Sequence, residues 1–245
     1  MLCKAIIFDY IGTLVDCGNY TMEDSRHKLY MALTFEGLRV PEDKFLAAYV
    51  AAHEKYRIVR YEQLKEVTNA VWVAEALNNL GIKVTAEDFR VKAALNAFFQ
   101  EYIDTLTVRD GAKKLLRLAE QQCKVGLISN FTHAPVIYSS LRKLGLNGYF
   151  NTVVVSEQIG WRKPSIRIFK ETLSRLKVNA DEAVFIGDSP IEDIKGAKEA
   201  GLKTIFVPSQ FNTLKDLSDS KVKPDYIAKD IPEIAEILAK IFSPM

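Results

Sequence analysis

Short apolar runs rich in isoleucine, valine and phenylalanine alternate with segments of helical period, and this alternation limits the possible folds more than any other feature of the chain. The runs cover residues 5–8, 125–128, 152–155, 183–186, 204–207 and 226–228. Each run is short and continuous, which is typical of a strand buried on both faces of a parallel sheet. Strands and helices in alternation pack as a mostly parallel sheet with helices on both sides. The sequence therefore predicts an α/β fold with a doubly wound parallel sheet.

One connection interrupts this alternation. Residues 21–102 carry several helical patterns and no convincing strand, although they come soon after the first strand. Pro41 and the two acidic residues after it suit the first turn of one helix, and residues 85–88 resemble a capping box that starts another. We expect about four helices here, forming a bundle above the carboxyl ends of the strands. The predicted domains are a core of residues 1–16 and 106–245 and a helical cap of residues 17–105.

Four clusters of polar residues follow predicted strands. In chain order they contain Asp9, then Ser129 and Asn130, then Lys163, then Asp188 with Asp193 five residues beyond it. Taken singly, such residues are common in turns and at helix caps. Taken together they are more specific, because open parallel sheets bind their ligands at the carboxyl ends of the strands. The sequence therefore predicts one functional site that these clusters share.

In this order the clusters resemble the four motifs of the haloacid dehalogenase (HAD) superfamily of hydrolases. The matching segments are residues 8–14 (FDYIGTL), Ser129 with Asn130, Lys163 with Pro164, and residues 187–193 (GDSPIED). The resemblance covers essentially the whole chain and implies a Rossmann-like core with a helical cap inserted between the first and second motifs. It also implies that Asp9 is a nucleophile that forms a covalent aspartyl intermediate.

The residue types agree with such chemistry. A carboxylate such as Asp9 can attack phosphorus or carbon and divide one difficult displacement into two, provided that positive charge lies nearby. Lys163 would supply that charge, and Ser129 would donate a hydrogen bond to a substrate oxygen. We therefore expect Asp9, Ser129 and Lys163 to be catalytic and Thr13 and Asn130 to bind the substrate.

Converging carboxylates also predict a metal ion. Two carboxylates beside one lysine are poorly compensated unless a hard cation joins them, and Mg²⁺ meets that demand. We expect Asp9 and Asp188 to bind Mg²⁺ directly, and Asp193 to bind it directly or to support the direct ligands. The resemblance adds the backbone carbonyl of Ile11 as a further ligand.

Ile11 departs from the family pattern, because most HAD phosphatases carry a second aspartate there that protonates the leaving group and then activates water. An isoleucine cannot transfer a proton, and losing such a group typically costs about 10²–10⁴ in rate. The first hypothesis is a Mg²⁺-dependent phosphohydrolase acting on a small phosphate ester or acyl phosphate.

Three alternatives stay open. A 2-haloacid dehalogenase needs no acid at Ile11, since halide leaves as an anion, but a bare Asp188 would repel its carboxylate substrate. A protein that binds a metabolite or a partner without turnover is the second alternative. A phosphonate-cleaving enzyme is the third, and it would need a lysine in the cap.

Composition limits the partners and the compartment. The 245 residues include 33 Lys and Arg against 31 Asp and Glu, and a net charge of +2 does not mark a nucleic-acid binder. The three cysteines, Cys3, Cys17 and Cys123, show neither a metal-binding spacing nor a disulfide framework. No stretch approaches about eighteen apolar residues, and the first apolar run is too short for a signal peptide. We expect a cytoplasmic enzyme with a small-molecule substrate, without nucleic-acid or membrane partners; its oligomeric state stays open.

Overall fold

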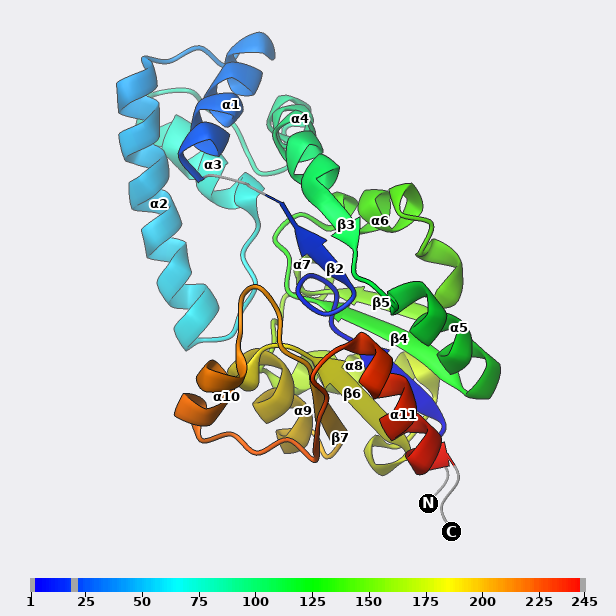
Figure 1. Ribbon diagram of the computed structural model, residues 1–245. Helices are drawn as coiled ribbons and strands as arrows, with labels where there is room; N and C mark the ends of the chain where they lie inside the picture. The colour runs from blue at the N-terminus through cyan, green and yellow to red at the C-terminus, as the bar shows by residue number, and fades with distance from the viewer. Residues whose placement is uncertain (1–2, 19–21, 243–245) are drawn as a thin grey trace.

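The computed structural model describes residues 3–18 and 22–242, and within them six strands form one parallel sheet (Figure 1). In sheet order these strands are β5 (Thr152–Val155), β4 (Lys124–Ser129), β1 (Ala5–Phe8), β6 (Ala183–Gly187), β7 (Lys203–Phe206) and β8 (Tyr226–Ile227). The predicted strands and the α/β fold class are thereby confirmed. β1 lies between β4 and β6, so the strand order reverses beside it, which is where open sheets of this kind bind ligands.

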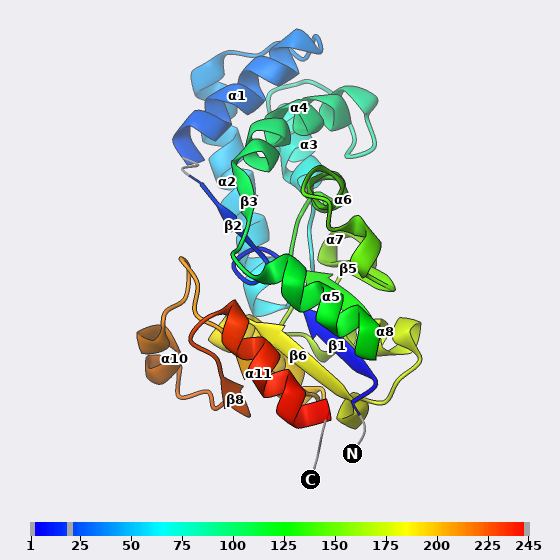
Figure 2. The same ribbon diagram turned by 45° about the vertical axis from the view of Figure 1, so that its right-hand side comes forward.

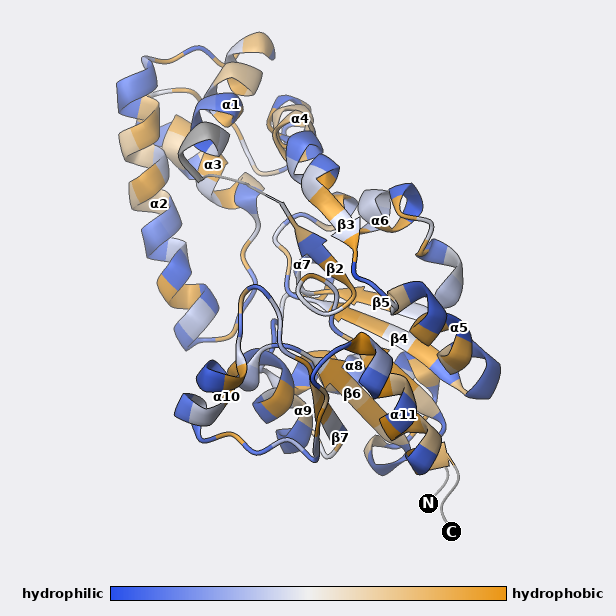
Figure 3. Ribbon diagram, in the orientation of Figure 1, coloured by the Kyte–Doolittle hydropathy of each residue, from blue (hydrophilic) through white to orange (hydrophobic). Residues whose placement is uncertain are grey.

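Helices cover both faces of the sheet. Successive residues of a strand point to opposite faces. Ile6 and Phe8 therefore pack with α5 (Ala112–Gln122), α6 (Ala134–Lys143) and α11 (Ile231–Phe242). Ala5 and Ile7 pack on the other face with α8 (Ile166–Leu176) and α9 (Gly196–Glu199). Burial on both faces explains why β1 carries no polar residue, and Figure 3 shows hydrophobic central strands beside helices of mixed character.

Three local predictions need correction. The sequence pattern predicts the strand at 226–228 as buried on both faces, but Tyr226 and Ile227 are 38% and 51% exposed, because β8 lies at the edge of the sheet. The predicted helix over 191–200 is a π-helical turn, η3 (Pro190–Lys195), followed by α9. Residues 85–88 do not form a capping box, since Asp88 is itself the N-cap and accepts a hydrogen bond from the Arg90 N–H (2.9 Å).

Shorter elements complete this part of the chain. They are α7 (Ser156–Ile159), α10 (Leu214–Ser220) and two 3₁₀ turns, η1 (Asn147–Tyr149) and η2 (Ala180–Glu182).

Residues 22–105 form what we call the helical unit. Its helices are α1 (Met22–Phe35), α2 (Glu42–Glu62), α3 (Asn69–Asn79) and α4 (Phe89–Thr105). α2 packs on α3 and α1 packs on α4, around a core of their own that buries Phe45, Trp72 and Leu95. Figures 1 and 2 show the helical unit on the side of the sheet where the strands have their carboxyl ends.

Two short strands connect the helical unit to the rest of the protein, and the sequence pattern does not reveal them. β2 (Val15–Cys17) and β3 (Leu106–Val108) pair antiparallel, with Asp16 opposite Thr107. The predicted domain boundaries, 16/17 and 105/106, fall in or beside these two strands, and the division into two domains stays a prediction. In the described part of the chain, every helix is too short or too polar to cross a membrane.

Candidate active site

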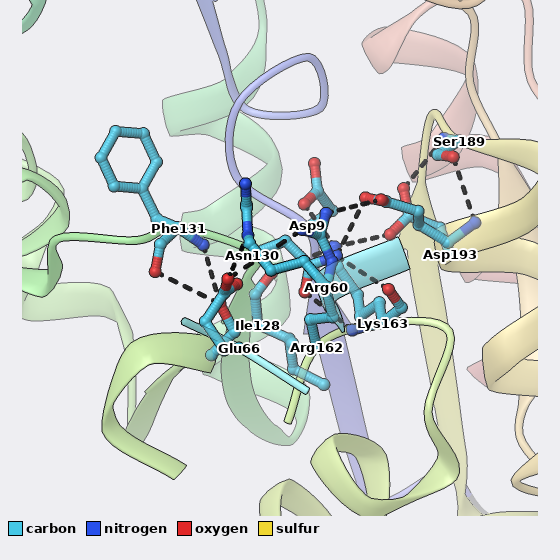
Figure 4. A network of polar contacts seen from close by, with 12 residues as sticks. Asp9, Arg60, Glu66, Ile128, Asn130, Phe131, Arg162, Lys163, Ser189 and Asp193 are labelled. Atoms are coloured by element: carbon cyan, nitrogen blue, oxygen red, sulfur yellow. Dashed lines mark hydrogen bonds and ion pairs between the residues drawn. The ribbon is translucent and has the colours of Figure 1, made fainter. Parts of the chain in front are cut away.

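Loops that follow β1, β4, β5 and β6 meet at the carboxyl edge of the sheet, next to the helical unit (Figure 4). They enclose a cavity of about 410 Å³. Its walls include every predicted site residue except Thr13, together with Tyr61, Ser189, Glu192, Phe211 and Asn212. The structure thus brings together residues that the sequence separates by up to 184 positions, from Asp9 to Asp193. The prediction that the four clusters converge is confirmed.

Asp9 lies directly after β1 and is held at both carboxylate oxygens. Lys163 Nζ donates to Asp9 Oδ1 over 2.6 Å, and Thr13 Oγ1 donates to Asp9 Oδ2 over 3.0 Å. The side chain is buried but lines the cavity. These contacts fix the orientation of the carboxylate and place a positive charge against it.

The loop after β1 approaches Asp188 very closely, and glycine makes this possible. Gly12 has a φ of +97°, and a Cβ built on it would lie 2.6 Å from Asp188 Oδ2. Arg109, next to β3, donates to the carbonyl oxygen of Gly12 in this loop and to that of Pro208 in the loop after β7. Arg109 therefore ties the turn at Gly12 to the loop after β7, and a side chain at position 12 would collide with the carboxylate of Asp188.

Lys163 is the positive centre of the site. Its side chain is 2% exposed, and its Nζ lies 2.6 Å from both Asp9 Oδ1 and Asp193 Oδ1. Burial by itself lowers the pKa of a lysine, but the charges of Asp193 and Asp9 outweigh it and raise the pKa of Lys163. The ammonium group therefore stays charged at neutral pH.

Asp188 follows β6 and receives hydrogen bonds from the loop after β7. Ser209 Oγ donates to its Oδ2 over 2.5 Å, and Asn212 Nδ2 donates to the same atom over 3.1 Å. Burial and the charge of Asp9 raise the pKa of Asp188 to about 6, although these two hydrogen bonds oppose the shift. An acidic group with its pKa raised in this way is one that a nearby cation would favour in its charged form.

The carboxylates fit a divalent cation. Oxygen atoms of Asp9, Asp188 and Asp193 all lie within 4.8 Å of one another, and the three side chains are buried. Burial also raises the pKa of Asp193, in spite of the opposing charge of Lys163. Three carboxylates face one lysine, so a hard, oxygen-seeking ion would restore the charge balance. Ile11 lines the same cavity, and a metal-ligand role for its backbone carbonyl stays a prediction.

The predicted substrate-binding residues hold other groups of the protein. Ser129, a predicted catalytic residue, lies at the end of β4, is buried and lines the cavity, and its role stays a prediction. Asn130 accepts from the Lys163 N–H (2.7 Å) and donates to the Lys163 carbonyl (3.0 Å) and to Glu192 Oε2 (2.9 Å). Thr13 donates to Asp9. The contacts of Thr13 and Asn130 position Asp9 and the Lys163 loop, and their binding of substrate stays a prediction.

Several residues of the site escape a reading of the sequence. Ser209 and Asn212 come after β7, and the rule that polar residues follow strands at a site could have found them. Tyr61, from the last turn of α2, lines the cavity without any local sequence signal. Glu66 and Arg162 form buried ion pairs near Lys163, but charged residues in loops are usually exposed.

Comparisons with known proteins agree with this geometry. The family model for haloacid dehalogenase-like hydrolases matches residues 3–201. A glyceraldehyde 3-phosphate phosphatase of Methanothermobacter thermautotrophicus is 33% identical over 241 residues, which is 97% of this chain and 100% of that protein. The enzyme of the same name from Methanopyrus kandleri is 30% identical over 242 residues, with 98% and 99% covered.

Among solved structures, a 2-haloacid dehalogenase from Pseudomonas syringae pv. Tomato DC3000 superposes with a TM-score of 0.68 at 23% identity and covers 98% of this chain and 100% of its own. That identity is low enough that the likeness establishes the fold alone. The family match over residues 3–201 and the two relatives aligned over nearly their whole length confirm the family that the four motifs indicate. The chain belongs to the haloacid dehalogenase-like hydrolases.

Proposed function

We propose that the protein is a Mg²⁺-dependent phosphohydrolase that transfers the phosphoryl group of a small metabolite first to Asp9 and then to water. The observation that carries this proposal is the arrangement at Asp9. Its carboxylate is held at both oxygens by Lys163 and Thr13, and it lies at the wall of a cavity beside Asp188 and Asp193. A carboxylate held in a fixed orientation next to positive charge is suited to nucleophilic attack on an anionic substrate.

The reaction has two displacements. In the first, a carboxylate oxygen of Asp9 attacks phosphorus, the bond between phosphorus and the leaving oxygen breaks, and an acyl phosphate forms on Asp9. In the second, water attacks that phosphorus, the bond to Asp9 breaks, and inorganic phosphate leaves. Lys163 balances the charge of the phosphoryl oxygens, and Ser129 donates a hydrogen bond to one of them.

Asp9, Asp188, Asp193 and the carbonyl of Ile11 would hold the Mg²⁺ ion. When bound, the ion shields the carboxylates from the phosphate and stabilises negative charge on the phosphoryl oxygens. Ser209 and Asn212 keep Asp188 oriented for this role through their hydrogen bonds to its Oδ2.

The need to protonate the leaving oxygen limits which phosphate compounds the protein would hydrolyse fastest. Ile11 lines the cavity and cannot donate a proton, so the leaving oxygen takes its proton from water. Acyl and aryl phosphates need little protonation and would react faster than alkyl phosphates. Glyceraldehyde 3-phosphate, which names the two relatives, is an alkyl phosphate, and we expect slow turnover of it here.

The charge of the cavity favours a substrate with a single phosphate. Among the described residues that line it, Lys163 is the one basic side chain, and it already contacts Asp9 and Asp193. The Glu192 side chain, 31% exposed, adds negative charge to the wall. A second phosphate would meet repulsion there, whereas Tyr61 and Phe211 offer aromatic surface to an uncharged remainder. We infer that the helical unit, which supplies Tyr61, acts as the cap of the active site.

A substrate panel tests the function. Aryl, acyl and alkyl phosphates and 2-haloacids are assayed with Mg²⁺ and with EDTA. We expect release of phosphate that EDTA suppresses. Release of halide without metal, and without any phosphatase activity, would replace the proposal with a dehalogenase.

The substitution Asp9→Asn tests the nucleophile. It keeps the shape of the side chain but removes its nucleophilicity, so activity should fall below about one tenth of the parent rate. The matched control is Asp181→Asn, the same change at an exposed residue just before the amino end of β6, which should leave the rate unchanged. Activity that survives in purified Asp9→Asn protein, with deamidation excluded by mass spectrometry, would rule out the covalent mechanism.

A further inference from the structure

The segment between α2 and α3 runs beside the segment that leads into Lys163. The Glu66 N–H donates to the Gly160 carbonyl over 2.9 Å, and the Arg162 N–H donates to the Leu64 carbonyl over 3.1 Å. Lys65 and Trp161 form an antiparallel bridge between these two bonds. The helical unit therefore adds a short strand-like ladder to the residues directly before the catalytic lysine.

The side chain of Glu66 is fully buried and reaches two loops of the core. Its Oε1 accepts from Arg60 Nε at 2.6 Å and lies 4.0 Å from Arg162 Nη1. Its Oε2 accepts from Ser156 Oγ at 2.6 Å. Ser156 Oγ in turn accepts from the N–H of Phe131, the residue that follows Asn130, over 2.9 Å. The Glu66 carboxylate thus accepts from Ser156, which holds the loop after β4, and lies near Arg162, in the segment before Lys163. Figure 4 shows Glu66 close to Phe131 and Arg162.

Arg162 links Glu66 to Glu192 through two ion pairs. Its side chain is 4% exposed, and its Nη2 donates to Glu192 Oε1 over 2.9 Å. The guanidinium group lies 4.2 Å from the centre of the Tyr61 ring. Its Nε and Nη1 atoms are buried, and within residues 3–18 and 22–242 neither has a hydrogen-bond partner. A buried cation with free donors is held chiefly by neighbouring charge, so Arg162 depends on Glu66 and Glu192.

The series of polar contacts that begins at Glu66 ends at Lys163. Glu192 Oε2 accepts from Asn130 Nδ2 at 2.9 Å. Asn130 then clamps the backbone of Lys163, accepting from its N–H over 2.7 Å and donating to its carbonyl over 3.0 Å. The first step, from Glu66 Oε1 to Arg162 Nη1, is an ion pair at 4.0 Å, and each later step from Arg162 to Lys163 is a hydrogen bond of 2.7–3.0 Å.

We propose that Glu66 is a positioning residue, which acts through Arg162, Glu192 and Asn130 so that Lys163 takes its catalytic place only when the helical unit is docked on the core. The proposal rests on the proposed function and adds a source of control to it. If the helical unit moved away, Arg162 and Ser156 would lose their partner and the Lys163 loop would relax. A displacement of about 1 Å at a catalytic group can cost about 10²-fold in rate.

The substitution Glu66→Gln tests the proposal, because it removes the charge and keeps the size. We expect kcat to fall by about 10- to 100-fold and KM to change much less, since a displaced Lys163 loses more of its contact with the charge of the transition state than with that of the bound substrate. The matched control is Glu75→Gln in α3, where the carboxylate pairs with Lys55 and Tyr56 inside the helical unit. It should leave kcat near the parent value, although it too removes an ion pair.

A second measurement reads the position of Lys163 without any turnover. An acetylating ester is applied to the folded protein, and modified lysines are identified by peptide mass spectrometry. Lys163 is buried and should be protected in the parent and in Glu75→Gln, but should react several-fold faster in Glu66→Gln. Lys4, 51% exposed, serves as the internal reference for reagent dose.

The outcomes are distinct. A parent protein that hydrolyses no phosphate compound refutes the proposed function, whereas the labelling of Lys163 still tests the positioning role. The positioning role is refuted if kcat is unchanged in Glu66→Gln, or if kcat falls with Lys163 still protected. Should Glu66→Gln fail to fold, Glu66→Asp retains the charge with a shorter reach and must show the same two effects in milder form.

Discussion

Replacing Gly12 by alanine should disable the site through one steric contact. The glycine has a φ of +97°, and the new Cβ would lie 2.6 Å from Asp188 Oδ2 and 2.9 Å from Oδ1. Ordinary contacts of a Cβ begin at 3.4 Å, so the loop or the carboxylate must yield by about 0.8 Å. Asp188 cannot swing away freely, because Ser209 and Asn212 hold its Oδ2.

The expected loss of folding free energy in Gly12→Ala has two parts. An L-residue with such a backbone costs about 1–2 kcal/mol. Forcing extra volume into a packed site costs typically about 1–3 kcal/mol more. Gly81→Ala isolates the first part, since Gly81 has a φ of +87° and no atom of the described part of the chain lies within 4 Å of its added Cβ. The control should lose only about 1–2 kcal/mol, or about 2–8 °C in Tm for a chain of this size.

The assay compares the two variants in three measurements. Thermal unfolding gives the stability cost, calorimetry gives Mg²⁺ affinity, and hydrolysis of an aryl phosphate gives the rate. We expect Gly12→Ala to bind Mg²⁺ at least about tenfold more weakly and to turn over about 10²-fold more slowly, because Asp188 is displaced. Gly81→Ala should match the parent in Mg²⁺ affinity and in turnover rate. Parental Mg²⁺ affinity and rate in folded Gly12→Ala would show that the contact with Asp188 does not govern the site.

Two further predictions concern a missing acid and a buried base. Ile11→Asp should raise the rate on alkyl phosphates more than on aryl phosphates, because poorer leaving groups depend more on protonation, and the gain should be at most about 10²–10⁴. The measurement compares mutant and parent rates across an ester series. A gain that does not grow with the pKa of the leaving group would refute the missing-acid explanation. Burial and the charge of Lys92 lower the pKa of His133 to about 4. The unfolded chain therefore binds the extra proton first, and stability should fall as pH drops from about 6.5 to 4, by at most about 3 kcal/mol. His133→Gln should flatten this part of the pH profile in urea unfolding, and an unchanged slope would contradict the shift.

The strands of the sheet and most of the polar groups at its carboxyl edge could be predicted from local sequence patterns. β1 is readable because a strand buried on both faces must be apolar along its whole length, and Asp9 stands out as the first polar residue after it. The same rule locates Ser129 and Asp188, since parallel strands end at one edge. The four helices of the helical unit follow from their periodicity and from glycine and proline at their ends.

The contacts that hold those polar groups in place could not be predicted in this way, because they form between segments far apart in the chain. β2 and β3 pair across about 90 residues, and neither strand is long enough to show a period. Asn130 reads as a substrate ligand in sequence, yet its amide clamps Lys163, because the partner of an amide is set by whichever backbone lies beside it. Glu66 looks like an exposed loop charge until the fold buries it between Arg60 and Ser156. Local patterns report which face of an element is apolar, whereas the pairing of buried polar groups depends on contacts between distant segments that only the folded chain creates.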